Sequence, residues 1–505
     1  MKHSRHLPLL LLAGEAATTQ PRVFQNLVQH FESAEMGPFI PFVELGFGAA
    51  PAVQPITGIF DTGSSDTIVP EAGSEVCQQA RQQCTAPAPV VLGQFDPAAA
   101  AAAGDFCRLD GQRFNATFGG GDQYDGDYIK TSVVLGQDGQ GRVAGAQVAL
   151  ASHSEPQTEL PQVPVFGLGP ILNEASDRPY NNLPKKMKKA GVTKGQAYSV
   201  VLNPTPLGNG SVFFGGIDRA KFEGELNEVP LAKNKRGELP EFVVKMSSVA
   251  LVPGARDAAN NGSARRNADA GRRAKRMPWK RGVGARRLGT AKNTYGPQGA
   301  ARREVGERRL AMRNNGGKRS DGYHKNRNGD KKNGNGNSNN GSNACNGSKN
   351  GNTEINLGLD PRDGFILMDT GGVEMALPAH VVSALAQALG TSFSEDDGLG
   401  PVPCGQLEGD AALIMRFQDD AVETRVPLAH MRLSAALADP ALTSDGLCQL
   451  VVRAVADGGG EGTSVATLPF FAAVYTVFDL DGNRLFFAPA KGDPGAPAAQ
   501  LEEFP

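Results

Sequence analysis

Short runs of alternating apolar and polar residues, separated by glycine, asparagine and proline, fill two stretches of the chain, residues 39–253 and 355–490. Runs of this kind between turn-forming residues predict short β-strands. We expect strands at residues 39–47, 114–118, 128–135, 198–202 and 211–214, and again at 412–417, 450–454 and 474–478. Two helices are expected, one at residues 183–190 with a solvated basic face and one at 379–389, where Val382, Leu385 and Leu389 have helical spacing. The pattern therefore predicts a mainly β protein.

The β-type pattern breaks off between the two stretches. Basic pairs give way to an asparagine- and glycine-rich run, and 24 basic residues stand against 6 acidic ones between Arg256 and Lys349. The formal net charge of −2 for the 505 residues therefore combines an acidic body with a basic segment. Apolar residues are too sparse here to offset chain entropy, which predicts disorder. The expected division is a signal or leader at 1–38, a first lobe at 39–253, a disordered basic insertion at 254–354, a second lobe at 355–490 and a tail at 491–505.

The N-terminus has the outline of a secretory signal, because basic residues precede a short apolar run at residues 7–13 and small residues follow it. No eighteen apolar residues follow one another, so no membrane span is expected. We expect a secreted or cell-wall protein, with the vacuole as the alternative compartment. The six cysteines include no Cys-x-x-Cys spacing, which leaves a zinc ribbon or a thioredoxin-like site without support.

Each of the two lobes contains one copy of the same motif, an apolar strand that runs into Asp-Thr-Gly. The copies begin at Asp61 and Asp369, and a proline follows each aspartate after nine residues. A duplicated β body with one such loop in each half suggests two lobes that face each other. Two carboxylates about 3 Å apart share a proton, so one can act as a base on water while the other polarises a peptide carbonyl. The paired motif therefore predicts peptide hydrolysis.

At these residues the chain resembles the pepsin-like aspartic proteases, with the closest similarity to secreted and cell-surface fungal members of the candidapepsin and yapsin kind. The resemblance covers most of residues 39–253 and 355–489. It rests on FDTGSSDTIVP (60–70), VFGLG (165–169), YSVVLN (198–203), GSVFFGGID (210–218) and FFAAVYTVFDLDGNRLFFAPA (470–490). It implies a bilobal, mainly β fold of two six-stranded-type lobes, a cleft between them, polypeptide substrates, and no cofactor or metal.

The resemblance also implies roles for single residues. Asp61 and Asp369 would form the catalytic pair, and the residues that support this pair would be Thr62, Gly63, Ser64, Thr370 and Gly371. The flap that covers the substrate would include Phe118, Gly119, Gly120 and Gly121. Cys404 and Cys448 would pair as the disulfide of the second lobe. Cys77 and Cys84 can close a small loop in the first lobe, although pairing with Cys107 stays open, as does the state of Cys345.

Four positions depart from the family pattern. Gly372 has no hydroxyl to donate to Asp369, Thr467 stands where the family has glycine, Phe118 replaces the flap tyrosine, and Ile68 replaces a tryptophan. We expect these departures to slow catalysis and expect the family residues, restored together, to raise kcat. A catalytically weak or inactive protein that binds peptides or polymers is therefore the alternative to an active endopeptidase.

Other classes of function find less support. The seven histidines show no metal-binding spacing, and no Gly-x-Ser-x-Gly elbow surrounds Ser64. The basic insertion lacks regular aromatic residues, so nucleic acid is not expected as a partner, although weak polyanion binding stays open. Its exposed basic pairs are sites where processing proteases cut, so we expect a monomer that can mature into two chains.

Overall fold

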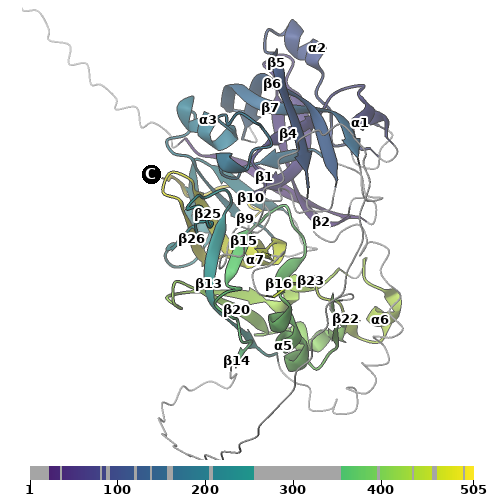
Figure 1. Ribbon diagram of the computed structural model, residues 1–505, viewed down its shortest axis with the longest axis vertical. Coiled ribbons are helices and arrows are strands. Elements are labelled where there is room, and N and C mark those ends of the chain that lie inside the picture. The colour runs from purple at the N-terminus through teal and green to yellow at the C-terminus, as the bar shows by residue number, and fades with distance from the viewer. Residues whose placement is uncertain are drawn as a thin grey trace, which may run out of the picture. The chain divides into compact units, whose positions relative to one another are not determined.

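The computed structural model describes residues 22–33, 37–79, 82–86, 91–118, 122–136, 139–155, 163–203, 209–254, 354–394, 398–434, 437–457, 463–492 and 495–504. These residues belong to one compact unit. Residues 255–353, and with them most of the expected insertion and Cys345, lie outside the described residues. The described part is built mainly from strands, so the expected mainly β fold is confirmed (Figure 1).

Thirteen strands form the larger sheet, hereafter the first sheet, in the order β12-β26-β25-β9-β10-β1-β2-β3-β8-β4-β7-β6-β5. Their bounds are β1 (Phe24–Ser33), β2 (Gly37–Phe47), β3 (Gln54–Asp61), β4 (Thr67–Pro70), β5 (Cys107–Thr117), β6 (Gln123–Leu135), β7 (Gly141–Glu155), β8 (Val165–Gly167), β9 (Ala197–Val201), β10 (Gly210–Phe214), β12 (Asn227–Pro230), β25 (Val474–Asp479) and β26 (Arg484–Pro489). β-Branched and aromatic residues dominate the inner strands, as in the wholly buried Val-Tyr-Thr-Val-Phe-Asp of β25.

Eight strands form the second sheet, in the order β21-β20-β13-β15-β24-β16-β23, with β14 paired to β13. Their bounds are β13 (Val243–Val252), β14 (Ile355–Asn356), β15 (Phe365–Met368), β16 (Met375–Pro378), β20 (Ala412–Phe417), β21 (Val422–Pro427), β23 (Val452–Val455) and β24 (Ser464–Ala466). Three small pairs join β11 (Gly216–Asp218) to β27 (Leu501–Glu503), β17 (Phe393–Ser394) to β18 (Gly398–Leu399) and β19 (Val402–Pro403) to β22 (Leu447–Cys448). The first sheet is larger than the six-stranded type expected, because β9, β10, β12, β25 and β26 extend it.

Helices are short. They are α1 (Glu75–Gln78), α2 (Pro97–Ala102), α3 (Leu183–Lys189), α5 (Ala379–Leu389), α6 (Pro440–Ser444) and α7 (Leu468–Ala473), with 3₁₀ turns η1 (Ile171–Asn173), η2 (Arg219–Lys221), η4 (Cys404–Leu407) and η5 (Leu428–Met431). Both expected helices are present as α3 and α5. Helix α5 buries Val382, Leu385 and Leu389 and ends at Gly390, whose φ of 70° is the left-handed conformation that glycine adopts without strain. None of the described helices has the length and apolar character that a membrane crossing requires.

The chain passes from one sheet to the other at two places. Strand β13 precedes residues 255–353 yet lies in the second sheet, whereas β25 and β26, near the C-terminus, lie in the first sheet. Both ends of the described chain also belong to the folded body. Strand β1, which the sequence analysis assigns to the leader, pairs with β2 and β10, and β27, in the expected tail, pairs with β11. The body therefore extends beyond the expected lobe boundaries at both ends.

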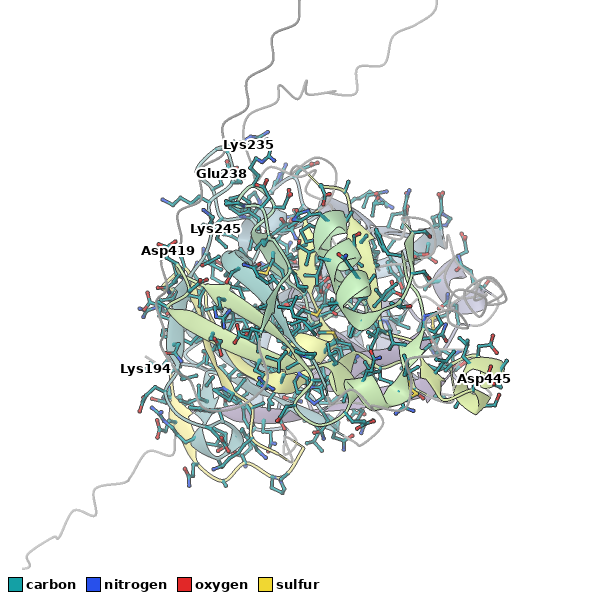
Figure 2. All side chains as sticks on the ribbon, turned by 90° about the horizontal axis from the view of Figure 1, so that it is seen from below. Lys194, Lys235, Glu238, Lys245, Asp419 and Asp445 are labelled. Carbon is teal, nitrogen blue, oxygen red and sulfur yellow. A yellow bond between two sulfur atoms is a disulfide. The ribbon has the colours of Figure 1, made fainter. Side chains whose placement is uncertain are left out.

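A row of contacting aromatic side chains in the core begins at Phe60, the residue before the first Asp-Thr-Gly motif. Phe60 meets Tyr198 edge to face at 6.0 Å, Tyr198 stacks on Phe478 at 5.0 Å, and Phe478 meets Phe242 at 4.8 Å. These aromatic side chains are buried and come from β3, β9, β25 and the segment before β13. Charged side chains lie on the outside, as Lys194, Lys235 and Asp445 do in Figure 2.

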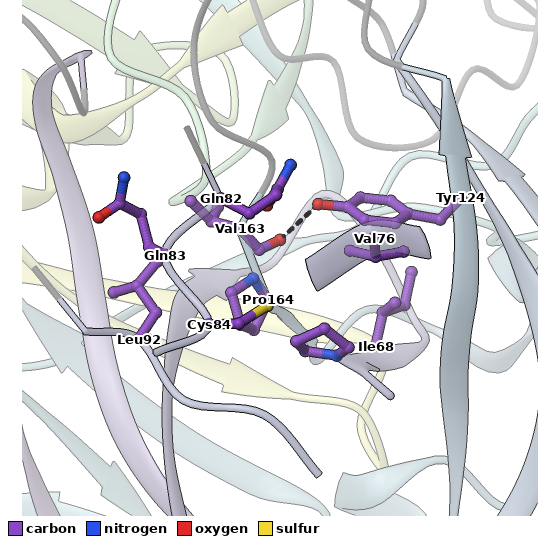
Figure 3. Close-up of a pocket in the computed structure, with 10 residues that line it drawn as sticks. Ile68, Val76, Gln82, Gln83, Cys84, Leu92, Tyr124, Val163 and Pro164 are labelled. Atoms are coloured by element: carbon purple, nitrogen blue, oxygen red, sulfur yellow. Dashed lines mark hydrogen bonds between the residues drawn. The ribbon is translucent and has the colours of Figure 1, made fainter. Parts of the chain in front are cut away.

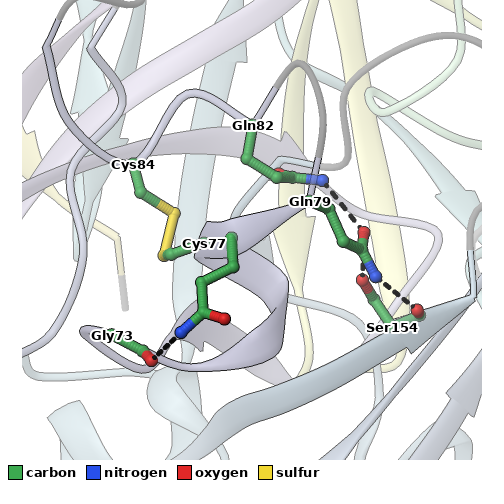
Figure 4. Close-up of a disulfide and its surroundings, with 7 residues drawn as sticks. Gly73, Cys77, Gln79, Gln82, Cys84 and Ser154 are labelled. Atoms are coloured by element: carbon green, nitrogen blue, oxygen red, sulfur yellow. Dashed lines mark hydrogen bonds between the residues drawn. A yellow bond between two sulfur atoms is a disulfide. The ribbon is translucent and has the colours of Figure 1, made fainter.

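One disulfide lies in each half of the fold. Cys77, in α1, is bonded to Cys84, which settles the pairing that the sequence leaves open, and Cys404 is bonded to Cys448. Cys107 is exposed and free. Figure 4 shows the first disulfide beside α1, where Gln79 exchanges hydrogen bonds with Ser154 of β7. The hydrogen bonds fasten the end of α1 to the first sheet, and the disulfide joins α1 to the loop that carries Cys84.

The two motifs lie in matching sets of strands. Strand β3 pairs in parallel with β8, and β4 pairs with β8 in antiparallel and with β7 in parallel orientation. Strand β15 pairs in parallel with β24, and β16 pairs with β24 in antiparallel and with β23 in parallel orientation. The repeat seen in the sequence is therefore a repeat of strand topology, and it places Asp61 and Asp369 at equivalent points.

Candidate active site

The two aspartates of the repeated motif end buried parallel strands. Asp61 is the last residue of β3 and is fully buried, and Asp369 follows β15 and is 2 % exposed. The N–H of Gly63 donates to Asp61 Oδ1 at 2.8 Å, and the N–H of Gly371 donates to Asp369 Oδ1 at 2.8 Å. Each carboxyl group is thus oriented by the backbone of its own loop in the same way.

The two threonines of the motif bind the loops to each other. Thr62 Oγ1 accepts the N–H of Thr370 at 3.0 Å and donates to the carbonyl of Met368 at 2.7 Å. Thr370 Oγ1 accepts the N–H of Thr62 at 3.1 Å and donates to the carbonyl of Phe60 at 2.8 Å. Both threonines are buried, so these four hydrogen bonds are shielded from water. They fix the spacing between the strands that carry Asp61 and Asp369.

The carboxyl group of Asp369 lies against the backbone of the opposite loop. A Cβ atom on Gly63 would lie 2.8 Å from both Cγ and Oδ1 of Asp369. A side chain at this position would push the carboxyl group away, so glycine is required by the close approach of the two loops. The residues Asp61, Thr62, Gly63, Ser64, Asp369, Thr370 and Gly371 of the sequence analysis are therefore brought together.

Burial and mutual contact shift the titration of both acids. Burial raises the pKa of Asp61 to about 6, although hydrogen bonds from its surroundings act to lower it. Burial, followed by the charge of Asp61 and the hydrogen bond between the two carboxyl groups, raises the pKa of Asp369 well above its ordinary range. The direction is that of two like charges in one buried site, which hold a proton between them.

The surroundings of the two acids differ at the third residue after each aspartate. The Ser64 hydroxyl interacts with the Asp61 carboxyl group and lowers its pKa. Their geometry is not that of an aligned hydrogen bond, because Ser64 Oγ and Asp61 Oδ2 are both buried without a well-aligned partner among the described residues. Gly372 occupies the equivalent position beside Asp369 and has no hydroxyl.

Asp66, which the sequence analysis did not single out, is a buried centre of hydrogen bonds behind the first motif. Its carboxylate accepts the hydroxyls of Tyr128 and Tyr180 at 2.7 and 2.8 Å and the N–H of Ala175 at 2.7 Å. Burial raises the pKa of Asp66 despite these donors. The sequence signal that could have found it is an aspartate directly before the wholly buried strand β4.

The segment around η1 connects Asp66 to the motif. Asn173 donates from Nδ2 to the carbonyl of Gly63 at 3.0 Å, and Glu174 accepts the N–H of Tyr180 at 2.8 Å. Burial raises the pKa of Glu174 to about 8, and the nearby charge of Asp66 adds to the shift. Two half- to fully buried acids therefore lie behind the first loop.

The flap region is only partly described. Gly119, Gly120 and Gly121 lie outside the described residues. Phe118 is buried in a cluster with Ile68, Val76 and Tyr124, so the expected pair of apolar partners, Phe118 and Ile68, is part of one apolar cluster. The ring of Tyr124 meets that of Phe118 edge to face at 5.5 Å.

Tyr124 is a second residue that the sequence analysis did not find. Its hydroxyl donates to the carbonyl of Val163 at 2.9 Å, as Figure 3 shows. Ile68, Tyr124 and Val163 line a cavity of about 10 Å³. Because so little space is left, a tryptophan at position 68 would overpack this cluster while Tyr124 is present. Ile68→Trp with Phe118→Tyr is therefore expected to fit only if Tyr124 is replaced by a smaller residue as well.

One group of described side chains has the composition of a metal site: Asp363, His380 and Asp457. Both ring nitrogens of His380 already have hydrogen-bond partners within the protein. Its Nε2 accepts the N–H of Asp360 at 3.3 Å, and its Nδ1 lies 2.7 Å from Asp457 Oδ1. Asp457 also accepts the backbone N–H of His380 in the first turn of α5. The group therefore closes the N-terminal end of α5.

Comparison with known proteins gives a family for this arrangement. The model of the eukaryotic aspartyl protease family matches residues 42–274 and 356–490. A probable aspartic-type endopeptidase OPSB of Arthroderma benhamiae is 31% identical over 218 residues, which are 42% of this chain and 40% of that protein. Secreted aspartic protease 6 of Candida albicans is 32% identical over 196 residues, 36% of this chain and 40% of that protein. The aligned part therefore spans well under half the length of these relatives.

Proposed function

The chain belongs to the eukaryotic aspartyl protease family, and we propose on this basis that it hydrolyses peptide bonds with Asp61 and Asp369 as a proton-sharing pair. The observation that carries the proposal is the contact of two buried carboxyl groups whose loops are joined by reciprocal threonine hydrogen bonds. Acid–base hydrolysis needs a base and an acid within hydrogen-bond reach of one reacting centre, and this pair supplies both.

In the proposed reaction, Asp61 is ionised and Asp369 holds the shared proton. Asp61 removes a proton from water, and the water oxygen forms a bond to the carbonyl carbon while Asp369 protonates the carbonyl oxygen. Asp61 then returns its proton to the amide nitrogen as the C–N bond breaks, and Asp369 recovers a proton from the hydroxyl that becomes the new carboxyl group. Protons and bonds balance, and the pair is regenerated for the next cycle.

The roles follow from the environments of the two acids. The Ser64 hydroxyl favours the ionised form of Asp61, whereas the Asp61 charge and burial favour the protonated form of Asp369. The singly protonated pair is the reactive form. Because burial raises the pKa of Asp61 to about 6, we propose that activity falls as pH drops through that value, where Asp61 takes up a proton, and falls again at higher pH, where Asp369 loses the shared proton.

A cleavage assay tests the proposal. The purified chain is incubated with an internally quenched peptide library between about pH 4 and 8, with and without pepstatin, and cleavage is followed by fluorescence. We expect cleavage that pepstatin abolishes. Asp445→Asn, at an exposed site, is the matched control and should cleave as the unmodified protein does. Cleavage that resists pepstatin would contradict an aspartate pair.

A second function, peptide binding without efficient hydrolysis, has one observation in its favour. Gly372 leaves Asp369 without the hydroxyl neighbour that Ser64 gives Asp61. Equilibrium binding of pepstatin and of peptides from the same library separates the two functions. Tight binding of both without turnover would favour a binding protein, whereas turnover of the bound peptides would exclude it.

We also propose export from the cell. The N-terminal signal outline and relatives named as secreted proteases support it. The hydrogen-bonded strand β1 begins at Phe24, so a leader removed without damage to the first sheet would end before that residue. N-terminal sequencing of the secreted product tests this, and a mature N-terminus within β1 would contradict it.

Cleavage at the basic pairs between residues 255 and 353 would leave the two parts joined. Strand β13, which precedes this segment, pairs with β15 and β20, which follow it. Strands β25 and β26 likewise pair with β9 and β12. We therefore propose an associated two-chain form. A secreted product that migrates as one full-length chain after reduction would contradict it.

A further inference from the structure

The strand register shows which residue stands beside each aspartate. In the parallel pair of β3 and β8, Asp61 lies opposite Gly167. In the parallel pair of β15 and β24, Met368 lies opposite Ala466, so that the next pair in register is Asp369 and Thr467. Thr467 is therefore the counterpart of Gly167, just as Gly372 is the counterpart of Ser64.

In each half a side chain lies between the Asp-Thr-Gly loop and the neighbouring segment. In the first half this side chain belongs to the loop, and in the second half it belongs to the neighbouring segment. A Cβ atom on Gly167 would lie 2.5 and 2.6 Å from the backbone oxygen and nitrogen of Asp66 and 2.8 Å from Ser64 Oγ, so in the first loop the backbone of the loop and the Ser64 side chain together fill this space. A Cβ atom on Gly372 would lie 2.7 Å from Thr467 Cγ2, so in the second loop the side chain comes from the neighbouring segment. The hydroxyl-bearing residue and the glycine have exchanged places.

The backbone at Gly372 does not itself require glycine. Its φ is outside the left-handed region, in contrast to glycines such as Gly390. What leaves no room for a side chain is Thr467, since a separation of 2.7 Å between carbon atoms is shorter than real contacts. The absence of a hydroxyl at position 372 and the presence of one at 467 are therefore a single structural feature.

Thr467 also holds the backbone of the second loop. It is 1 % exposed, and its hydroxyl donates to the carbonyl of Val373 at 3.1 Å. The N–H of the next residue, Leu468, donates to the carbonyl of Gly372 at 3.4 Å. The N–H of Asp369 donates to the carbonyl of Ala466 at 2.9 Å. The loop is thus fastened to the same short segment, Ala466–Leu468, at its aspartate and again at Gly372 and Val373.

We propose that Thr467 is the positioning residue of Asp369: its methyl group fills the space beside Gly372, its hydroxyl fixes the loop at Val373, and Asp369 is left without a hydroxyl neighbour. This rests on the proposed function, because positioning matters only if Asp369 reacts. It also assigns the acid and the base. Asp61 has Ser64 beside it and is the base, whereas Asp369 has no hydroxyl at the equivalent position, Gly372, and holds the proton.

A cycle of four proteins tests the proposal: the unmodified chain, Gly372→Ser, Thr467→Gly, and both together. Gly372→Ser alone must displace Thr467, whose Cγ2 would lie 2.7 Å from the new Cβ, and with it the loop that carries Asp369. A misplacement of about 1 Å can lower kcat roughly 100-fold. Thr467→Gly alone releases the loop and should lower kcat about 10-fold with little change in KM. The double variant recreates the arrangement of the first loop, so it should recover kcat to within about 3-fold of the unmodified chain.

Two further variants separate the methyl group from the hydroxyl. Thr467→Ser keeps the hydrogen bond to Val373 and should retain more activity than Thr467→Val, which keeps the shape and leaves a buried carbonyl without its donor. The pH profile gives a readout that packing alone would not move. A serine at position 372 can donate to ionised Asp369, so the alkaline limb of kcat/KM should shift to lower pH in the double variant.

Gly492→Ser, at an open site where no atom lies within 4 Å of the new Cβ, is the matched control for the added side chain and should behave as the unmodified chain does. The melting temperature of each variant is measured alongside activity. If Gly372→Ser costs the same kcat and the same melting temperature with and without Thr467, the proposal is overturned. If the unmodified chain does not cleave peptides, the proposed function fails, while the coupling in melting temperature still decides whether Thr467 occupies the space of residue 372.

Discussion

The two Asp-Thr-Gly loops share an inner construction and differ in their outer support. In both, a glycine N–H orients the carboxyl group and a threonine hydroxyl reaches across to the other loop. Behind the first loop, buried Asp66 gathers two tyrosine hydroxyls and a backbone N–H. At the equivalent point behind the second loop stands Glu374, which is half-buried. The hydrogen bonds made by the glycines and threonines of the two motifs are therefore symmetric, whereas the acidic residues behind the two loops differ.

The difference matters because unequal neighbours assign the roles of acid and base to the two members of a proton-sharing pair. Two acids in identical environments would each hold the proton half of the time, whereas a neighbour that favours one charged form assigns the roles. Ser64 provides this neighbour for Asp61, and the exchange of Gly372 and Thr467 removes it from Asp369. The asymmetry of the outer layer thus acts on the chemistry of the inner one.

The inner symmetry predicts equal losses on the two sides. Asp61→Asn and Asp369→Asn each remove one carboxyl group from the pair, and we expect either change to lower kcat at least about 1,000-fold because acid and base act together. Folding is checked by the melting temperature and by pepstatin binding. Substantial turnover in either variant would show that the pair is not the catalytic centre.

The two disulfides extend the comparison to stability. Cys404 and Cys448 are 44 residues apart, whereas Cys77 and Cys84 are 7 apart. In the chain-entropy model the longer loop contributes about 4 kcal/mol and the shorter about 2.4 kcal/mol. We expect Cys404→Ser with Cys448→Ser to lower the free energy of unfolding more than Cys77→Ser with Cys84→Ser. Denaturant titration measures both, and the reverse order would show that native-state contacts of α1 outweigh loop entropy.

The buried acids behind the first loop predict that stability depends on pH. Burial raises the pKa of Glu174 to about 8 and also raises that of Asp66. An acid whose folded-state pKa is raised favours folding while it is protonated, so its contribution is present below its ordinary pKa of about 4.5 and is lost as pH rises towards 8. Stability of the unmodified chain should fall over this interval.

Glu174→Gln isolates that effect. Glutamine keeps the size and cannot ionise, so the fall in the free energy of unfolding between about pH 5 and 8 should be reduced, by an amount on the order of 1 kcal/mol for a partly exposed acid. Denaturant titration at several pH values measures this slope. Glu238→Gln, at an exposed site, is the control and should leave the slope unchanged. An unchanged slope in Glu174→Gln would contradict the assignment.

The catalytic pair can be predicted from the sequence, whereas the residues packed around it cannot, because they are brought together only by the folded sheet. Asp-Thr-Gly repeats because both copies need the same residues, so the pair Asp61 and Asp369 is visible as a motif. The relation of Gly372 to Thr467 depends on the register of β15 with β24, and residues distant in sequence are matched only by the folded sheet. Strand β1 precedes the recognisable pattern and therefore resembles a leader in the sequence, yet its backbone hydrogen bonds with β2 and β10 do not depend on a motif.

The smallest expected effect concerns Tyr124, which lies in β6 of the first sheet. Its hydroxyl holds the flap strand β6 to the carbonyl of Val163, and its ring packs on Phe118. Tyr124→Phe keeps the ring and removes one buried hydrogen bond, which should cost about 1 kcal/mol of stability and leave a carbonyl without its donor. Because the proposed flap would contact substrate and not the carboxyl groups, we expect KM to rise a few-fold with kcat nearly unchanged. Tyr475→Phe, which removes a buried hydroxyl bonded to Ser199, is the matched control and should lower stability without changing KM. Equal effects of both variants on KM would mean that Tyr124 stabilises the first sheet in general and does not anchor the flap.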